Sequence, residues 1–428
     1  MRLSKWFVWA HRKQGRHTIS IFLVLLLLLS GLSGCAPKTE EEYHNENPPI
    51  AGILSVQDGQ LVTPDGEPIT LFGVNLGGWM LMETWMGAVS NYAEDWGYYD
   101  TLEVLESRFG AEKTAALIDL YEDHFITAED IAQIERLGFN CVRVPFWYRN
   151  FMTEDGAWLA EEPAENPGFQ RLDWLLEQCG QHGIYVILDL HGAPGGQSMN
   201  HCTGKAGRNL LYTEEKNLET TERLWKAIAA RYRENPVVAS YDLLNEPQNN
   251  GGYTGDTAWA AESAEAVSHT NDAYDRLYRA VRAEDDAHLV SLEGVWSTTV
   301  LPDPNEMGYE NMLYQLHLYD TDRGMVDYRV RELVTARKDW GVAVLVGEFN
   351  NQKQERYACG QYRKNQISYI KWTYKTVNTG DNWGLYNGNL KRIDIKTATY
   401  EEIAECFENR LHTADFIFNE QEMADISP

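Results

Sequence analysis

The sequence predicts an α/β fold, a single (β/α)8 TIM barrel preceded by a short N-terminal β-hairpin. Eight short apolar runs of strand length lie between Ile69 and Trp372, and segments with helical spacing of apolar residues separate them. Strands that alternate with helices are typical of a parallel sheet, and eight such units suffice to close one barrel. The chain of 428 residues shows no internal repeat and suits one barrel with insertions.

The first 34 residues differ from the rest. They carry five basic residues and no acidic one, followed by the apolar run 19–29 and then Leu-Ser-Gly before Cys35. This order is typical of an export signal. The ending resembles a bacterial lipoprotein box, in which Cys35 is lipidated and becomes the first residue. An uncleaved anchor is the alternative, but a membrane span needs about 20 apolar residues.

Either interpretation places the rest of the chain on the extracellular side of the membrane, anchored or secreted. Residues 35–50 are acidic, polar and rich in proline, which predicts a flexible tether. Residues 51–428 are then the barrel domain.

The charge of the chain narrows its partners. Beyond the five basic residues of the leader, 32 Lys and Arg face 64 Asp and Glu, a balance of −32. Such a surface argues against nucleic acid and against electrostatic binding to anionic lipid, and it suits a neutral ligand such as a sugar. We expect a monomer that meets the membrane only through its lipid.

The elements follow in order from the N-terminus. Residues 53–71 contain the turn signals Asp58-Gly59 and Pro64-Asp65-Gly66 between apolar residues, which predicts hairpins. The predicted core strands are 69–75, 140–145, 184–190, 238–244, 287–292, 312–318, 343–348 and 367–372. The predicted helices are 127–137, 169–182, 214–233, 262–283, 325–340 and 399–411.

Two of these strands end in a glutamate. The run VASYDLLNEPQ stops at Asn245, Glu246 and Pro247, because proline cannot donate to a sheet ladder. The run AVLVGEFN reaches Gly347 and Glu348 in the same way. The carboxyl ends of barrel strands form the face that carries the chemistry. Two carboxyls there suit glycoside hydrolysis, whereas either one alone could be an ordinary loop carboxylate.

Other strands also end in polar or aromatic residues. A lone histidine or arginine at a strand end is more often structural. Polar residues that converge from six strands are harder to explain in that way, because burying them unpaired is costly. The further residues of this set are Arg143, Asp189, His191, His317, Tyr319 and Trp372.

The cysteines give weaker signals. With Cys35 used for the lipid, five remain, so an exported protein would keep at least one free thiol. Cys141 lies in an apolar strand and is expected to be buried. Cys202 and Cys359 lie on expected loops and could pair. No spacing of Cys and His indicates a metal site, and we expect no cofactor.

Taken in order, these residues resemble glycoside hydrolase family 5, the retaining β-glycanases of the cellulase clan. The resemblance covers about residues 53–411 and follows the family's recurring set, here Arg143, His191, Asn245, Glu246, His317, Tyr319, Glu348 and Trp372.

Within the family, the exo-β-1,3-glucanase branch is the most similar. FGVNLGGWMLMETW at 72–85, DLHGAPGGQ at 189–197 and Trp372-Thr373-Tyr374-Lys375 resemble its motifs, with Tyr374 in place of a second tryptophan. Glu83 matches a carboxylate that contacts the bound sugar in that branch. His201 or Asn200 stands where the branch has an acidic residue.

The resemblance implies retaining hydrolysis of β-glucosidic bonds in extracellular β-glucan or oligosaccharides. Glu246 would be the acid/base and Glu348 the nucleophile, with Arg143 and Tyr319 bonded to Glu348. Asn245 would hold the sugar's 2-hydroxyl.

The remaining roles are supportive. His317 would orient Tyr319 or Glu246, and His191 would contact the sugar or brace Arg143. Trp372 would form a platform under the sugar ring, with weaker candidates at Trp79, Trp147 and Trp383. This chemistry requires neither metal nor organic cofactor. The alternatives are an endo-β-1,4-glucanase, a mannanase or a glycolipid hydrolase of the same fold, and a catalytically silent glycan-binding lipoprotein.

Overall fold

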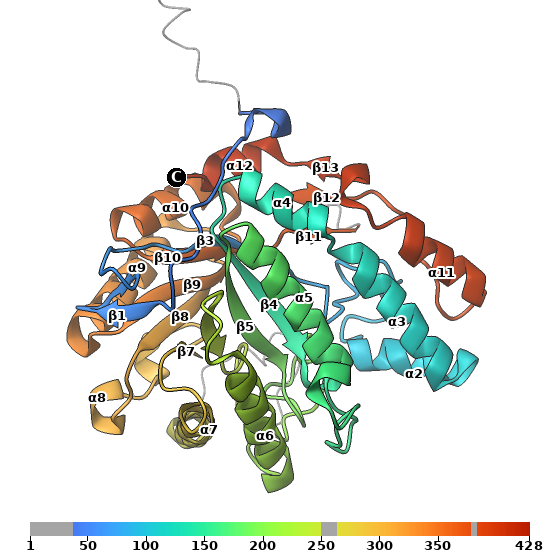
Figure 1. Cartoon of the computed structure of the whole chain (residues 1–428), viewed down its shortest axis with the longest axis horizontal. Helices are drawn as coiled ribbons and strands as arrows, with labels where there is room; N and C mark the ends of the chain where they lie inside the picture. The colour runs from blue at the N-terminus through green and yellow to red at the C-terminus, as the bar shows by residue number, and fades with distance from the viewer. Residues whose placement is uncertain (1–36, 250–262, 378–382) are drawn as a thin grey trace, which may run out of the picture.

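The computed structural model describes residues 37–249, 263–377 and 383–428 (Figure 1). Eight parallel strands close into a barrel in the order β3 to β10, which confirms the predicted (β/α)8 architecture. The barrel strands are β3 (Phe72–Asn75), β4 (Cys141–Trp147), β5 (Tyr185–Gly192), β6 (Val238–Asp242), β7 (Leu289–Glu293), β8 (Met312–Leu318), β9 (Ala343–Phe349) and β10 (Ser368–Lys371). The predictions for the leader and for Cys35 fall outside the described residues.

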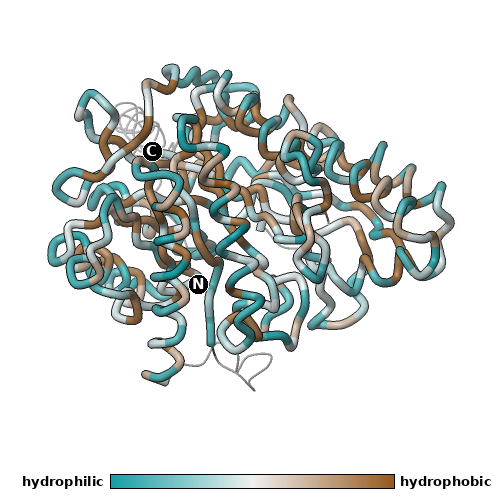
Figure 2. Tube along the Cα trace, turned by 60° about the horizontal axis from the view of Figure 1, so that its bottom comes forward, coloured by the Kyte–Doolittle hydropathy of each residue, from teal (hydrophilic) through white to brown (hydrophobic). Residues whose placement is uncertain are grey.

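Helices surround the barrel, and all six predicted helices are present. They are α4 (Ala128–Arg136), α5 (Pro167–Gln181), α6 (Glu215–Tyr232), α7 (Ala264–Arg282), α9 (Arg323–Trp340) and α11 (Tyr400–Asn409). Helix α4 begins after Thr127, whose backbone N–H donates to Asp130 at 2.8 Å. Hydrophobic segments gather in the interior and hydrophilic ones along the outer helices (Figure 2).

Within the described residues, five helices were not predicted from the sequence. They are α2 (Tyr98–Phe109), α3 (Ala111–Phe125), α8 (Pro304–Met307), α10 (Glu355–Lys364) and α12 (Glu420–Ile426). Helices α2 and α3 form an insertion after the first barrel strand and lie with α11 at one side of the barrel (Figure 1). Helix α2 begins after Gly97 and buries few side chains, so it shows little apolar periodicity.

The hairpin closes the N-terminal end of the barrel. Strands β1 (Ser55–Gln57) and β2 (Gln60–Val62) pair antiparallel across Asp58 and Gly59, both with positive φ. Leu54 and Leu61 pack on an apolar layer inside the barrel, formed by residues such as Cys141, Ile187 and Leu345. This layer makes the lower barrel a packed core and leaves only the opposite end for polar groups.

A second small sheet lies outside the barrel. It consists of β11 (Lys375–Thr376), β12 (Tyr386–Asn387) and β13 (Ile417–Phe418). The chain between β11 and β12 includes Trp383, whose backbone carbonyl accepts a hydrogen bond from the Thr373 N–H at 2.9 Å. Within the described part of the chain, no helix has both the length and the apolar character of a membrane span.

The described part of the expected tether is bound to the domain, so the prediction of a flexible segment was wrong there. The side chain of Asn47 donates to the carbonyls of Phe139 and His182, at 2.8 and 3.2 Å. The ring of Tyr43 packs edge-on against Phe418. Asn47 thus binds backbone carbonyls of two loops at the N-terminal end of the barrel. The composition of the segment does not reveal such contacts.

The possible pairing of Cys202 with Cys359 is absent. All five described cysteines are free and buried. Cys359 lies in helix α10 rather than in a loop, and Cys202 lies in a short 3₁₀ turn, η4 (His201–Thr203), beside Glu246. Cys141 is buried as expected.

Candidate active site

The upper half of the barrel interior is polar because inward-facing residues alternate along each strand. Arg143 follows Cys141 on β4 at this spacing, and Asp189 follows Ile187 on β5. A register shift between Leu316 and His317 on β8 pairs His317 with Glu348 on β9. The predicted convergence of polar side chains at the carboxyl ends of the strands is therefore present.

Arg143 lies at the centre of this layer, and its side chain is fully buried. Its guanidinium bonds Asp242 (Nε, 2.9 Å), Glu348 (Nη1, 2.7 Å) and Asp189 (Nη2, 3.1 Å). It also donates to the side-chain oxygens of Asn75 and Asn245. Burial opposes its charge, but the surrounding carboxylates raise the pKa of Arg143 and keep it cationic.

Glu348 receives two strong donors. Arg143 Nη1 donates to Oε1 at 2.7 Å, and the Tyr319 hydroxyl donates to Oε2 at 2.7 Å. Both contacts match the roles predicted for these residues. Burial raises the pKa of Glu348 to about 7, while Arg143, His191 and the Tyr319 hydrogen bond act to lower it.

Glu246 has a different environment. His317 Nδ1 lies 3.0 Å from Oε1, and the thiol sulfur of Cys202 lies 4.0 Å from Oε2. Burial, and then the charge of Glu348, raise the pKa of Glu246 well above its ordinary range. No cation contacts its carboxyl among the described residues, so Glu246 favours the protonated form.

Two histidines connect these groups. His191 Nδ1 lies 2.7 Å from Asp189, and its Nε2 lies 3.3 Å from the amide nitrogen of Asn245. Burial lowers the pKa of His191 to about 4 and that of His317 well below its ordinary value, so both rings are neutral. The expected direct brace between His191 and Arg143 is replaced by a contact through Asp189, which both residues bind.

A pocket of about 320 Å³ opens above this layer. Trp372 lies in its wall and stacks on His191, with ring centroids 5.6 Å apart. Glu83 lies in the wall too and accepts a hydrogen bond from Trp85 Nε1 at 2.8 Å. The lining residues are Glu83, Trp85, His191, Asn200, His201, Cys202, Glu246, Trp296, Tyr319, Glu348, Trp372 and Trp383.

The weaker tryptophan candidates have different positions. Trp383 lines the pocket. Trp79 is completely buried against Trp174 and donates to the carbonyl of Glu122 at 2.8 Å. Trp147 is buried under Gly192 and Gly204 and is not among the residues that line the pocket. Trp79 and Trp147 therefore contribute to packing, and their prediction as sugar platforms was wrong.

Several residues of the site were not singled out from the sequence. Asp242, Asn75 and Gln315 complete the polar layer, and Trp85 and Trp296 line the pocket. Glu293 was also missed, although the sequence held a signal for it. The run LVSLEG ends a strand in a glutamate, just as the runs at Glu246 and Glu348 do.

Comparison with known proteins places the site in a family. The model for "Cellulase (glycosyl hydrolase family 5)" matches residues 106–389, more than half of the chain. The chain belongs to glycoside hydrolase family 5. It is therefore a glycoside hydrolase, as the ordered set of site residues predicted.

Named relatives of this family 5 chain differ in activity. A beta-xylosidase of Phanerodontia chrysosporium is 29% identical over 76% of this chain and 71% of its own length. A probable glucan 1,3-beta-glucosidase A of Emericella nidulans is 34% identical over 43% of this chain, which spans only 44% of that protein. Among solved structures, an Aspergillus niger rutinosidase (TM-score 0.58, 16% identity, 79% of this chain and 98% of that one) shares the fold.

One group in the site has ligand atoms at metal-binding spacing. Those of Glu246, Glu293 and His317 lie within 4.8 Å of one another. Carboxylate and imidazole can bind a divalent ion. An ion held there would occupy the carboxyl of Glu246 and the imidazole beside it, so it would compete with a proton on Glu246.

Proposed function

We propose that the chain is a retaining glycosidase that hydrolyses β-glucosidic bonds, with Glu348 as nucleophile and Glu246 as acid/base. The observation that carries the proposal is the asymmetry of donors. Arg143 and Tyr319 both donate to Glu348, whereas no cation contacts Glu246 among the described residues. Donors and cations favour the charged form of a carboxyl, and their absence in a buried site favours the neutral form.

In the first step, Glu348 attacks the anomeric carbon while Glu246 protonates the leaving oxygen. The bond from carbon to Glu348 forms as the glycosidic bond breaks, which leaves Glu348 as a neutral ester. Asn245 is oriented for the 2-hydroxyl, because its side-chain oxygen is held by Arg143 at 2.8 Å. Hydrogen bonds to that hydroxyl strengthen in the transition state.

In the second step, Glu246 takes a proton from water, and that water attacks the anomeric carbon. The ester bond breaks, and Glu348 leaves as the carboxylate that Arg143 and Tyr319 stabilise. Two inversions retain the configuration at the anomeric carbon.

The spacing of the carboxyls supports retention. His317 Nδ1 lies 3.0 Å from an oxygen of Glu246 and 3.4 Å from an oxygen of Glu348. The distance between those two oxygens cannot exceed the sum of these two distances. The separation of about 5–5.5 Å in retaining enzymes lies within this limit.

The substrate that we propose is β-1,3-glucan, attacked from its end. The names of the glucan 1,3-beta-glucosidase relatives and the motif at 72–85 support this choice. An endo-acting β-1,4-glucanase is the second candidate, because a cellulase family model matches and a Pyrococcus horikoshii endocellulase shares the fold (TM-score 0.51). Loops rather than the shared barrel layer set such preferences.

Product analysis on laminarin, carboxymethylcellulose and mannan tests the proposal. Wild-type protein should release single glucose units from laminarin with retained configuration, and Glu348→Gln should release none. Mixed short oligomers would favour the endo candidate. Glucan binding without release by the wild type would favour the silent glycan-binding lipoprotein.

We also propose that the chain is exported and anchored through a lipid on Cys35. The docking of Asn47 below the barrel supports an arrangement in which the pocket, at the opposite end, faces away from the membrane. Replacement of Cys35 by Ser should move the protein from the membrane fraction to the medium or periplasm. Retention in the membrane would instead favour an uncleaved apolar anchor.

A further inference from the structure

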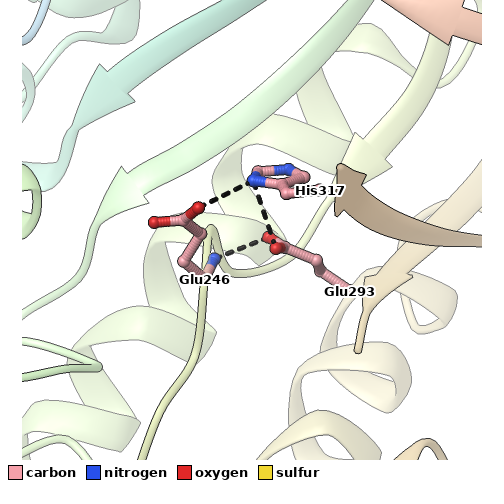
Figure 3. Close-up of side chains that lie close together, drawn as sticks. All are labelled: Glu246, Glu293 and His317. Atoms are coloured by element: carbon pink, nitrogen blue, oxygen red, sulfur yellow. Dashed lines mark hydrogen bonds and ion pairs between the residues drawn. The ribbon is translucent and has the colours of Figure 1, made fainter. Parts of the chain in front are cut away.

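A third buried glutamate, Glu293, lies beside Glu246. It is the last residue of β7 and is 1% exposed. Its Oε2 accepts a hydrogen bond from the backbone N–H of Glu246 at 2.6 Å, and its Oε1 lies 3.3 Å from Nδ1 of His317 (Figure 3). Within the described ranges Oε1 has no hydrogen-bond partner. Hydrolysis by two carboxyls does not account for this third one.

The backbone of Glu246 is held in an unfavourable conformation. Its φ of 42° lies in the left-handed region, which residues other than glycine seldom adopt. Pro247 follows, and a residue before proline favours an extended backbone, so the positive φ of Glu246 is unfavourable for a second reason. Such a conformation persists only where neighbouring contacts fix it. Glu293 supplies one of these contacts directly, at the N–H of the strained residue.

His317 joins the carboxyls in a single cluster. Its Nδ1 lies 3.0 Å from Glu246, 3.3 Å from Glu293 and 3.4 Å from Glu348. Its Nε2 has no partner among the described residues, so we place the single proton of the neutral ring on Nδ1. Its one N–H therefore bonds Glu246, while the carboxyls of Glu293 and Glu348 lie within 3.4 Å of the same nitrogen.

We propose that Glu293 is a positioning residue for Glu246: its Oε2 fixes the backbone of Glu246, and its negative charge favours a proton on the Glu246 carboxyl. The inference rests on the proposed role of Glu246 as acid/base. In the free enzyme, Glu348 is ionised and the pair Glu246–Glu293 holds one proton. When Glu246 protonates the leaving oxygen, Glu348 becomes a neutral ester, so the three glutamates carry two negative charges both before and after the step.

The surroundings of this pair disfavour charge on both carboxyls, through burial first, then through Glu348 for Glu246 and through Glu246 for Glu293. Arg143 is the fixed cation among the groups that face it, and it already binds Asp189, Asp242 and Glu348. At low dielectric, two neighbouring carboxyls do not both ionise readily. The titratable groups around the pair are Glu83, Arg143, Asp189, His191, Cys202, Asp242, Tyr274, His317, Tyr319 and Glu348.

The test is Glu293→Gln in the full chain, assayed on laminarin and on dinitrophenyl β-glucoside across pH. The amide removes one of the negative charges near Glu246 that favour its protonated form, so the basic limb of kcat/KM should move about one unit to lower pH. We expect a loss of about tenfold or more in kcat on laminarin, whose leaving group needs the acid. The dinitrophenyl substrate needs little acid and should lose far less.

Two further variants separate positioning from folding. Glu293→Asp keeps the charge, but its shorter side chain reaches the Glu246 N–H less well, so kcat on laminarin should fall. The basic limb of the kcat/KM profile should stay at the same pH. Glu355→Gln removes another buried carboxyl, bound to Lys371 and outside the pocket, and should lower the melting temperature without moving either limb. Thermal melts confirm that each variant is folded at the assay temperature.

Equal losses on both substrates with an unchanged basic limb in Glu293→Gln would overturn the inference. If the Gln variant does not fold, an unchanged kcat on laminarin in Glu293→Asp would overturn it instead. The proposed function fails in a different way. If Glu246→Ala is not rescued by azide on the dinitrophenyl substrate, Glu246 is not the acid/base, whatever Glu293 does.

Discussion

Glu348 and Glu246 end two strands of one barrel, yet their surroundings differ. Glu348 accepts from Arg143 and from Tyr319, both at 2.7 Å. Glu246 faces a neutral imidazole, a thiol sulfur and a second buried carboxyl. Burial disfavours charge on both carboxyls, so the donors decide which of them stays ionised.

The comparison shows how one layer of side chains gives two like groups opposite preferences for charge. The guanidinium contacts Glu348 directly, whereas a further carboxyl, Glu293, lies beside Glu246. Burial also raises the pKa of Asp189 to about 7 and that of Asp242 to about 6, although Arg143 opposes the shift in both. The layer therefore holds more acidic groups than its single cation can keep ionised.

Among the variants that test this comparison, Glu348→Gln should cause the largest loss of activity. Without the nucleophile no glycosyl-enzyme can form, so kcat on laminarin should fall by about 10⁴-fold or more. Reducing-sugar release measures the loss. Thermal melting should show a folded protein, because the amide keeps the size of the side chain. Activity within tenfold of the wild type would remove Glu348 from the nucleophile role.

Glu246→Ala should cost about 10²–10⁴-fold on laminarin, since that is the usual contribution of general acid–base catalysis. The loss should be much smaller for the first step on dinitrophenyl β-glucoside, whose leaving group needs no proton. Azide should restore turnover and yield a β-glycosyl azide. An α-configured azide product would contradict the retaining assignment.

Much of the fold could be predicted because each barrel strand is buried on both faces. Runs such as 184–190 and 343–348 are then almost continuously apolar, and they recur between amphipathic helices. Helix α2, which follows the first barrel strand, and helix α12, near the C-terminus, were not predicted, because few of their side chains are buried. The bound segment around Asn47 was not predicted either, since its hydrogen bonds go to backbone carbonyls whose positions the sequence does not reveal.

The site was predictable where a strand ended in an unusual residue. Glu246, Glu348 and His317 gave this signal, and the structure brings them together. Asp242 and Gln315 gave none, because they stand inside apolar runs and are explained only by the guanidinium and amide contacts across the barrel. The pocket tryptophans depend on loop paths, so sequence alone did not separate Trp383 from Trp79.

Tyr319→Phe should produce a smaller loss on the nucleophile's side. A hydrogen bond to a charged group contributes about 1.5–3 kcal/mol, so kcat/KM should fall about 10- to 100-fold. Tyr314→Phe is the matched control, because this buried tyrosine lies on β8 and donates to the carbonyl of Pro302, at 2.7 Å. It should lose about 1 kcal/mol of stability and no activity. Equal kinetic losses in both variants would assign Tyr319 to packing.

Shifts in the pH profile of kcat/KM should be the smallest effects of these variants. They should also distinguish most clearly between Glu348 and Glu246. Glu348 must be ionised for attack, so its protonation sets the acidic limb of kcat/KM. Burial raises the pKa of Glu348, and that limb should lie above 4.5, the ordinary value. Tyr319 stabilises the charged form, so Tyr319→Phe should move the acidic limb up by about one unit and leave the basic limb in place.

Glu293→Gln should do the reverse, since it acts on Glu246, whose deprotonation sets the basic limb. The two variants should therefore narrow the active range from opposite sides. In the double variant their shifts should depart from additivity by about 0.5 kcal/mol or more, because His317 Nδ1 lies within 3.4 Å of Glu246, Glu293 and Glu348. If either single variant moved both limbs equally, the two glutamates would titrate as one unit, and the division of charge between them would not hold.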